Sequence, residues 1–327
     1  MIKEISTSLT PKDIFGAWKV RWGVGRMDYS VKPGLYAVGK PGNESPVFVS
    51  ANYKLTFDVL RKSLSGLNCW LLILDTKGVN VWCAAGKGTF GTDELIRCIE
   101  ASGLAKYVSH KKLILPQLGA SGVSAPKVVS QIGYEVMYGP VRAKDIKAYL
   151  HAGCKASKEM RTVKFTVWDR LVLTPMEIVP VVKNALPVLG VMFFLNQFAA
   201  KPFDKSDAAA FSASVMSGAV LTPLLLPFIP GNAFAWKGWL TGLCSCAGVI
   251  LLSGKFKGED RLMAAGSLLV YPAISSFLAM NFTGSSTYTS PSGVKKEMKR
   301  ALPLIAGSAV VGAALTLGTH IFGRRGK

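Results

Sequence analysis

A single cysteine inside a run of small residues is the feature of this sequence best suited to chemistry. Cys83 stands in the run 75–88, DTKGVNVWCAAGKG, and small residues follow it at 84–86. Small side chains let a backbone approach a flat ligand closely. Lys87 supplies a positive charge that favours the thiolate, the form of cysteine that binds metals, and Trp82 offers an apolar wall. The alternative interpretation is a buried, inert cysteine.

The elements around this run predict where it lies. The apolar segment Trp70–Leu74 predicts a buried strand before it, and the segment Asp93–Ser102 predicts a helix after it. Thr92 is suited to cap the start of that helix, and Gly103 to end it. The run is therefore expected to be the loop between a strand and a helix. In α/β proteins, ligands bind in such loops, beyond the carboxyl ends of the strands.

The rest of residues 1–165 has the same alternating character. Further strands are predicted at 35–38, 47–49, 113–115 and 135–138, and further helices at 57–64, 125–131 and 143–150. Alternating strands and helices favour a mostly parallel α/β sheet. We therefore expect an N-terminal α/β domain with a Rossmann-like parallel sheet. The first twelve residues are mostly polar, so we expect no signal peptide.

Two phosphate-binding motifs are excluded in this domain. A Walker A loop would need Gly at position 81 and Ser or Thr at position 88, where the sequence has Val81 and Gly88. Gly23 and Gly25 begin a dinucleotide fingerprint, but Asp28 stands where its third glycine is needed. The six cysteines include no C-x-x-C pair, so the chain encodes no zinc ribbon and no ferredoxin-type cluster.

The second half of the sequence has a different composition. Five uncharged stretches follow one another, at 184–200, 208–236, 238–254, 262–294 and 301–323. A bilayer-spanning helix needs about 20 mostly apolar residues, so we predict an all-α transmembrane domain of five helices over 184–327. Residues 166–183 are amphipathic and predict either a linker helix or a helix in the membrane interface.

The overall composition agrees with a membrane protein. Half of the residues are hydrophobic, 18% are charged and the mean hydropathy is +0.32, whereas soluble domains average about 25% charge. The net charge of +20 indicates attraction to anionic lipid rather than nucleic-acid binding, because no basic cluster is interleaved with stacking aromatics. We expect a multi-pass protein of the cytoplasmic (inner) membrane, with domain 1–165 in the cytoplasm.

Three segments resemble a known family. The eight residues 80–87, NVWCAAGK, are similar to the cap-helix motif of the corrinoid mercury-methylation proteins, the HgcA family. The segments 33–39 with 50–56, and 116–123 with 138–143, resemble that family and its relative, the large subunit of the corrinoid iron–sulfur protein. Five spans after a corrinoid domain also match the HgcA family, and Ser50 departs from the threonine expected there.

The resemblance implies roles for individual residues. Cys83 would be the catalytic residue and the lower axial ligand of a corrinoid cobalt, bound as thiolate. The residues implied to bind the corrinoid around it, on the cap and in loops at the strand ends, are Ser50, Asn80, Trp82, Ala84, Ala85, Gly86, Lys87, Gly119, Ala120, Gly122, Val123, Gly139, Pro140, Val141 and Arg142. The glycines among them are equally compatible with simple turn geometry.

The resemblance also implies an activity. The protein would be a corrinoid-dependent methyltransferase that passes a cobalt-bound methyl group to Hg(II), as a carbanion equivalent or as a radical, giving methylmercury. Its methyl group would derive from methyltetrahydrofolate. Because the chain lacks cluster cysteines, a separate ferredoxin-like protein with two iron–sulfur clusters, HgcB, would supply electrons.

Three other functions stay open at this stage. The first is a membrane-anchored corrinoid methyl carrier of one-carbon metabolism, as in the acetyl-CoA pathway, with another acceptor. The second is a small transporter with a regulatory domain, which the near absence of charge in the spans disfavours. The third is a thiol redox protein, for which Cys83 lacks a resolving C-x-x-C partner.

Overall fold

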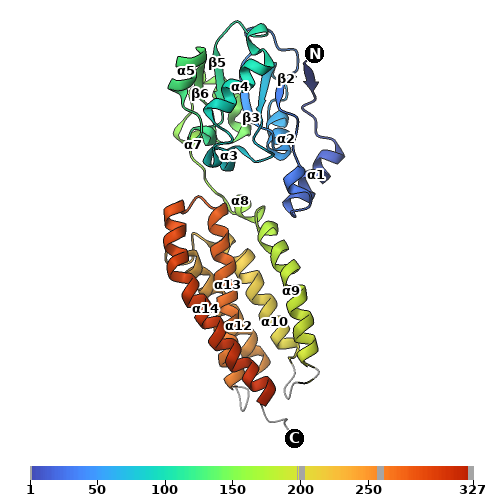
Figure 1. Cartoon of the computed structure of the whole chain (residues 1–327), viewed down its shortest axis with the longest axis vertical. Coiled ribbons are helices and arrows are strands. Elements are labelled where there is room, and N and C mark those ends of the chain that lie inside the picture. The colour runs from blue at the N-terminus through green and yellow to red at the C-terminus, as the bar shows by residue number, and fades with distance from the viewer. Residues whose placement is uncertain (1, 197, 199–202, 256–260, 323–327) are drawn as a thin grey trace. The chain divides into compact units, whose positions relative to one another are not determined.

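The computed structural model describes residues 2–196, 198, 203–255 and 261–322. They form two compact units, Met1–Lys164 and Phe165–Lys327 (Figure 1). The first unit has a six-stranded sheet, and the second is helical.

The strands of the first unit are β1 (Lys3–Ile5), β2 (Gly34–Val38), β3 (Val47–Ala51), β4 (Cys69–Leu74), β5 (Lys112–Leu115) and β6 (Glu135–Tyr138). They lie in the order β1-β2-β4-β3-β5-β6. The four strands β4, β3, β5 and β6 are mutually parallel, whereas β2 runs antiparallel to β4. All five predicted strands are confirmed, and the sheet is mixed but rich in parallel pairs.

The helices of the first unit are α1 (Pro11–Arg21), α2 (Lys54–Ser63), α3 (Val81–Lys87), α4 (Thr92–Ser102), α5 (Ala125–Ile132), α6 (Ile146–His151) and α7 (Lys158–Arg161), with 3₁₀ turns η1 (Arg26–Asp28), η2 (Leu104–Lys106), η3 (Gln117–Gly119) and η4 (Ala143–Asp145). The helix predicted at 143–150 is thus divided between η4 and α6. Thr92 is the first residue of α4, and Gly91 stands at the cap position before it. The Thr92 hydroxyl oxygen accepts a hydrogen bond from the Ser124 N–H at 2.9 Å instead of capping the helix.

Helices cover both faces of the sheet. In β4, Leu72 and Leu74 belong to the core cluster that also holds residues of α3, α4 and α5. The intervening Leu71 and Ile73 belong to a second cluster, which holds residues of α2 and α6. Because side chains alternate along a strand and both faces are covered, β4 is apolar at every position.

The elements of the second unit are α8 (Val167–Leu171), α9 (Thr174–Asn196), α10 (Lys205–Met216), a π-helical turn η5 (Ser217–Leu221), α11 (Thr222–Leu225), α12 (Phe234–Ser253), α13 (Arg261–Asn281), η7 (Phe282–Ser285) and α14 (Pro291–Phe322). The helices approach closely at small residues. A Cβ on Gly238 of α12 would come within 2.7 Å of the Ser275 carbonyl oxygen on α13. Small contact residues are typical of packed membrane helices.

Four helical segments are long and apolar enough to cross a membrane: Lys205–Leu225, Phe234–Ser253, Arg261–Ser285 and Ser292–Thr319. Five predicted spans are therefore not confirmed within the described residues. The first predicted stretch, 184–200, lies partly outside the described residues, and its described part falls in α9. The stretch 208–236 does not form one helix, because prolines at 227 and 230 accompany the break after Leu225.

Candidate functional site

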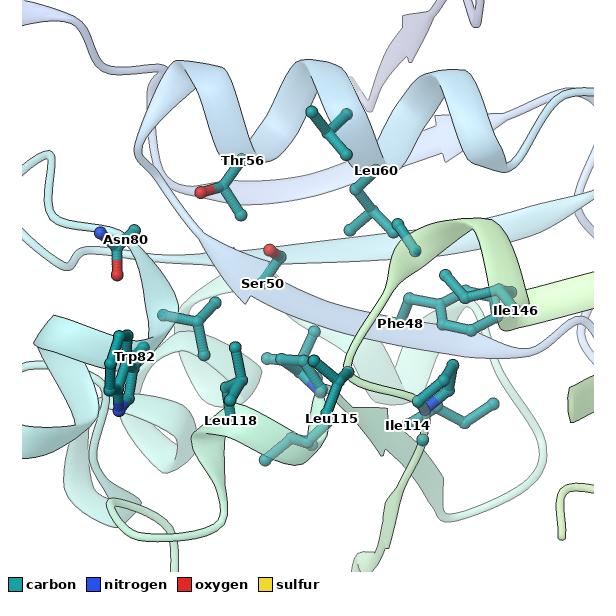
Figure 2. A pocket seen from close by; sticks show the side chains of 18 of the residues that line it. Phe48, Ser50, Thr56, Leu60, Asn80, Trp82, Ile114, Leu115, Leu118 and Ile146 are labelled. Atoms are coloured by element: carbon teal, nitrogen blue, oxygen red, sulfur yellow. The ribbon is translucent and has the colours of Figure 1, made fainter. Parts of the chain in front are cut away.

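A cavity of about 380 Å³ lies at the carboxyl edge of the parallel strands. Its walls include Ser50 of β3, Leu115 at the end of β5 and Gly139 just after β6, together with Asn80 and Trp82 at the start of α3 (Figure 2). This is the edge at which α/β sheets bind ligands. Residues from four separate segments of the sequence therefore meet at one hollow.

The cavity is polar at one end and apolar at the other. Ser50, Thr56 and Asn80 gather at one side in Figure 2, whereas Phe48 and Ile146 line the opposite side. Arg21, from α1, is also part of the lining and is its one charged residue among those the structure describes. Such a cavity suits a ligand arm that carries both an apolar ring and a polar or anionic group.

The cap over this edge is the short helix α3, where a loop was predicted from the residues. The Asn80 side chain accepts a hydrogen bond from the Cys83 N–H at 3.0 Å and so caps the helix. Gly88 ends it in the left-handed conformation, with φ of 82°, which glycine adopts without strain. Cys83 is thus held in the first turn of a helix with defined ends.

The two faces of α3 have different roles. Ala84 and Ala85 are buried beneath the helix and belong to the core. Cys83, Gly86 and Lys87 are exposed on the other face. A Cβ built on Gly86 would meet nothing within 4 Å. The exposed face therefore offers a thiol with open space beside it, which is what a flat macrocycle would need in order to approach the sulfur.

A hydrogen-bond network holds the segment that leads into α3. The amide oxygen of Asn52 accepts from the backbone N–H groups of Thr76 at 3.1 Å and Gly78 at 2.9 Å, and its amide nitrogen donates to Asp75 at 3.3 Å. The Asp75 N–H in turn donates to the Glu94 carboxylate at 2.8 Å. Asn52 is buried, so the connection between β4 and α3 is tied to β3 and α4.

The other predicted site residues fall into two groups. Gly139, Pro140 and Val141 line the cavity. Gly119 and Gly122 instead meet the core, since a Cβ on Gly122 would lie 2.1 Å from the Phe90 carbonyl oxygen. Like these two glycines, three more predicted residues do not belong to the described cavity lining: Ala120 is exposed, Val123 is buried and Arg142 is partly buried.

The cysteines of the first unit differ in accessibility. Burial raises the pKa of the Cys69 thiol and of the Cys98 thiol to about 12, so both stay protonated at neutral pH. Cys154 is partly buried, and Cys83 is exposed. Cys83 is therefore the best-placed thiol in this unit to reach a ligand.

The residues present fit a corrinoid in two respects. Cys83 offers an accessible sulfur on a face with no overhanging side chain at Gly86. The adjoining cavity combines Ser50, Asn80 and Arg21 with an apolar end. At about 380 Å³ it is far too small to enclose a whole corrinoid, so it would take only an arm of the ligand.

Sequence reasoning assigned no role to two of the polar residues that line the cavity, Arg21 and Thr56. Arg21 belongs to α1, a helix that was not predicted. The Phe15 and Trp18 side chains of this helix are more than 60% exposed. Thr56 lies in a segment quoted for its resemblance, but it was not assigned a role. The signal for Thr56 was its place in that segment, while the sequence offered no signal for Arg21.

The comparisons with known proteins bear on the first unit. The family model of the CO dehydrogenase/acetyl-CoA synthase delta subunit matches residues 24–150, which include the strands β2 to β6 and α3. This region is therefore similar to that family. The resemblance of residues 80–87 to the mercury-methylation family stays a prediction.

Similar proteins include gamma subunits of the acetyl-CoA decarbonylase/synthase complex. The gamma subunit of the acetyl-CoA decarbonylase/synthase complex of Archaeoglobus fulgidus is 32% identical over 127 residues, covering 38% of this chain and 27% of the relative. The gamma subunit of Methanocaldococcus jannaschii is 38% identical over 98 residues, covering 29% of this chain and 20% of the relative. The chain thus spans about a quarter of the length of these relatives.

Proposed function

We propose that the first unit binds a corrinoid and carries a methyl group, with Cys83 as the lower axial ligand of the cobalt. The observation that carries the proposal is an exposed thiol on the capped helix α3, beside an amphipathic cavity at the ligand-binding edge of the sheet. The similarity to acetyl-CoA decarbonylase/synthase subunits supports it. When bound, the corrinoid supplies a cobalt centre that accepts and releases methyl groups.

The residues of the chain have separate tasks in this proposal. Cys83 would hold the cobalt through its sulfur, as the deprotonated thiolate, since the thiolate is the ligating form. Asn80 fixes the backbone of Cys83 through its cap. Trp82, 40% exposed, forms an apolar wall that excludes water from one side. Ser50 and Thr56 offer hydroxyl groups to the polar end of the ligand arm.

The best-supported methyl acceptor belongs to one-carbon metabolism of the acetyl-CoA type. The relatives named above are subunits of an acetyl-CoA decarbonylase/synthase complex. The chain would then be a methyl carrier in a pathway of this kind, working with other protein subunits. A ferredoxin-like protein with two iron–sulfur clusters, such as HgcB, is the proposed electron donor, and methyltetrahydrofolate chemistry the proposed methyl source.

A second candidate acceptor is Hg(II), which a Cys83 thiolate on the cobalt would favour. A thiolate is a strong electron donor, and such a ligand favours departure of a methyl group with its electron pair. A metal cation accepts a methyl group of that kind readily. The eight-residue resemblance at 80–87 points to the same substrate, and the product would be methylmercury.

A methyl-transfer assay separates the two acceptors. Full-length protein, loaded with methylcobalamin, is incubated anaerobically either with Hg(II) or with a purified acetyl-CoA synthase. Methylmercury formation that requires Cys83 would support the mercury function, and transfer only to the synthase would support the one-carbon function. A protein that releases methyl groups to neither acceptor would contradict both.

We also propose that the second unit places this carrier on a membrane. Four of its helical segments have the length and apolar composition of bilayer spans. The proposal assigns the chain to the cytoplasmic membrane, with residues 1–165 as the cytoplasmic corrinoid domain and 166–183 as the connection. Fractionation of cells into membrane and soluble material tests it, and recovery of the intact chain in the soluble fraction would contradict it.

Arg21 should distinguish corrinoids by their nucleotide arm. Among the described residues it forms no ion pair, and it is the one charged residue of the described cavity lining. A complete corrinoid carries a phosphodiester in that arm, and a hydrogen bond to a charged group contributes about 1.5–3 kcal/mol. We expect Arg21→Gln to weaken cobalamin binding by about tenfold or more, while binding of cobinamide, which lacks the phosphodiester, stays unchanged.

The measurement is anaerobic titration followed by absorption spectroscopy. Lys19→Gln, which removes a charge from the same helix outside the described cavity lining, is the matched control. Equal losses of affinity for cobalamin and for cobinamide would show that Arg21 does not bind the phosphodiester.

A further inference from the structure

A second cavity, of about 920 Å³, lies within the helical unit and belongs to no part of the corrinoid site. Its lining comes from α12, α13, α14 and the segment before α14, and these helices lie side by side (Figure 1). We name it the α12–α14 groove. Its size falls in the range of ligand sites, about 300–1,000 Å³.

One end of the groove is cationic and aromatic. Lys296 and Arg300 stand four residues apart on α14, so they share one face of that helix. Neither forms an ion pair with another described residue. The lining carboxylate, Glu297, is already engaged, since it accepts a hydrogen bond from the Ala235 N–H at 2.7 Å in the first turn of α12. The groove therefore contains two cationic side chains and one carboxylate, and this carboxylate already accepts a hydrogen bond from the protein backbone.

Aromatic rings flank these charges. Trp236 and Trp239 are stacked with ring centroids 5.4 Å apart and planes 16° apart, and both line the groove together with Tyr288. Trp and Tyr are enriched where a membrane protein crosses the lipid headgroup region. Rings beside Lys and Arg therefore mark this end as the interfacial end.

The other end of the groove is apolar. Leu269, Leu304 and Ile305 line it, and Leu304 is 74% exposed. The Ser308 hydroxyl, at the far end, donates to the Leu269 carbonyl oxygen at 2.9 Å and so is satisfied within the protein. A chain lying along this wall would meet mostly carbon atoms.

The length of the groove matches one leaflet of a bilayer. From Lys296 to Ser308 a helix rises about 18 Å, and one half of the hydrocarbon core is about 15 Å thick. The span Ser292–Thr319 has 28 residues, about 42 Å, so its first turns extend beyond the core into the headgroup region. In the membrane placement proposed above, the cations would lie at headgroup depth and the apolar wall at acyl-chain depth.

We propose that the α12–α14 groove binds an anionic phospholipid, with its phosphate at Lys296 and Arg300 and an acyl chain along Leu304 and Ile305. Charge complementarity selects an anionic headgroup over a zwitterionic one. The inference rests on the membrane placement proposed above, but not on the corrinoid or on Cys83.

The test uses the full chain, purified in mild detergent and examined by native mass spectrometry with phosphatidylglycerol or phosphatidylcholine. We expect about thirtyfold higher retention of phosphatidylglycerol, since two cations at about 1 kcal/mol each near a membrane surface contribute about 2 kcal/mol, and every 1.4 kcal/mol is tenfold. The double variant K296Q/R300Q should lose that preference. The control K295Q/K299Q removes the same charge from α14 at residues outside the described lining, and should keep it.

Further arms separate the sources of the phosphate and the role of the apolar wall. Inorganic phosphate at equal ionic strength should not displace the lipid, and Ala301→Trp, which fills the groove without changing charge, should lower retention. Equal retention of both lipids, equal losses in the two charge variants, or displacement by inorganic phosphate would each overturn the proposal. Corrinoid binding by the same preparations, measured separately, reports on the first unit alone.

Discussion

Replacing Cys83 with alanine is expected to lower methyl transfer to Hg(II) by more than about a hundredfold. Loss of a residue that only supports a metal ligand costs about 10–100-fold, and loss of the ligand itself should exceed that. The exposed position of Cys83 on α3 means that the substitution leaves no cavity in the core. The measurement is single-turnover methyl transfer from reconstituted full-length protein.

The control for this variant is another exposed cysteine. Cys244 is exposed and lies in α12 of the second unit, so Cys244→Ala should transfer methyl groups at the normal rate. Thermal unfolding should be unchanged in both variants. If the Cys83 variant retained full transfer, sulfur ligation would have no part in the reaction.

Removing Arg61 is expected to destabilise the first unit by about 3–5 kcal/mol, because it breaks a buried ion-pair network and leaves Asp13 and Asp58 to share Lys54. The Arg61 side chain is 8% exposed and contacts Asp13 at 2.8 Å and Asp58 at 2.7 Å. It also donates to the carbonyl oxygens of Ser6 and Ser8. These contacts join α1, which carries Arg21, to α2. Arg61→Met should therefore lower the unfolding temperature and weaken cobalamin binding.

The matched control is an exposed arginine in a similar pair. Arg97 is 59% exposed and contacts Glu94 at 2.7 Å, so Arg97→Met should change stability by about 0–1 kcal/mol. Equal destabilisation by the two substitutions would contradict the role assigned to burial. Both are measured by thermal unfolding of the full chain in detergent.

The same network gives a dependence of stability on pH. Burial alone would raise the pKa of Asp13, but hydrogen bonds from Lys54 and Thr10 outweigh it and hold that pKa well below its usual range. A carboxyl with a depressed folded-state pKa contributes stability above its unfolded pKa of about 4, and loses it as pH falls toward the folded value. Asp13→Asn should flatten the decline in stability below about pH 4.

Strand positions were predictable because buried strands are apolar along their whole length, as in β4. Strand direction was not, since alternation of side chains is the same in parallel and antiparallel pairs, and β2 proved antiparallel to β4. Helix α1 escaped prediction because Val20 is its one buried residue and its apolar side chains Ile14 and Trp18 are exposed. Ion pairs with α2 hold this helix in place. Such pairs produce no periodic pattern of apolar residues in the sequence.

The site was predictable where a local motif carries it. Asn80, Trp82 and Cys83 were identified from one contiguous run, and the structure places Asn80 and Trp82 on the cavity wall with Cys83 next to them in α3. That run was expected to be a loop, because it stands between a predicted strand and a predicted helix, and Val81, Cys83 and Gly86 are also poor helix formers. The Asn80 cap and the burial of Ala84 overcome these propensities. The roles of Gly122 and Arg21 depend on residues distant in sequence.

The ultraviolet–visible spectrum of the full-length protein, reconstituted anaerobically with cobalamin, tests the central proposal most directly. A thiolate ligand on the cobalt gives a spectrum different from that of the free cofactor. We predict that Cys83→Ala removes this difference and that Cys244→Ala preserves it. A chain that binds no cobalamin, or a bound spectrum that is the same with and without the Cys83 sulfur, would contradict the account.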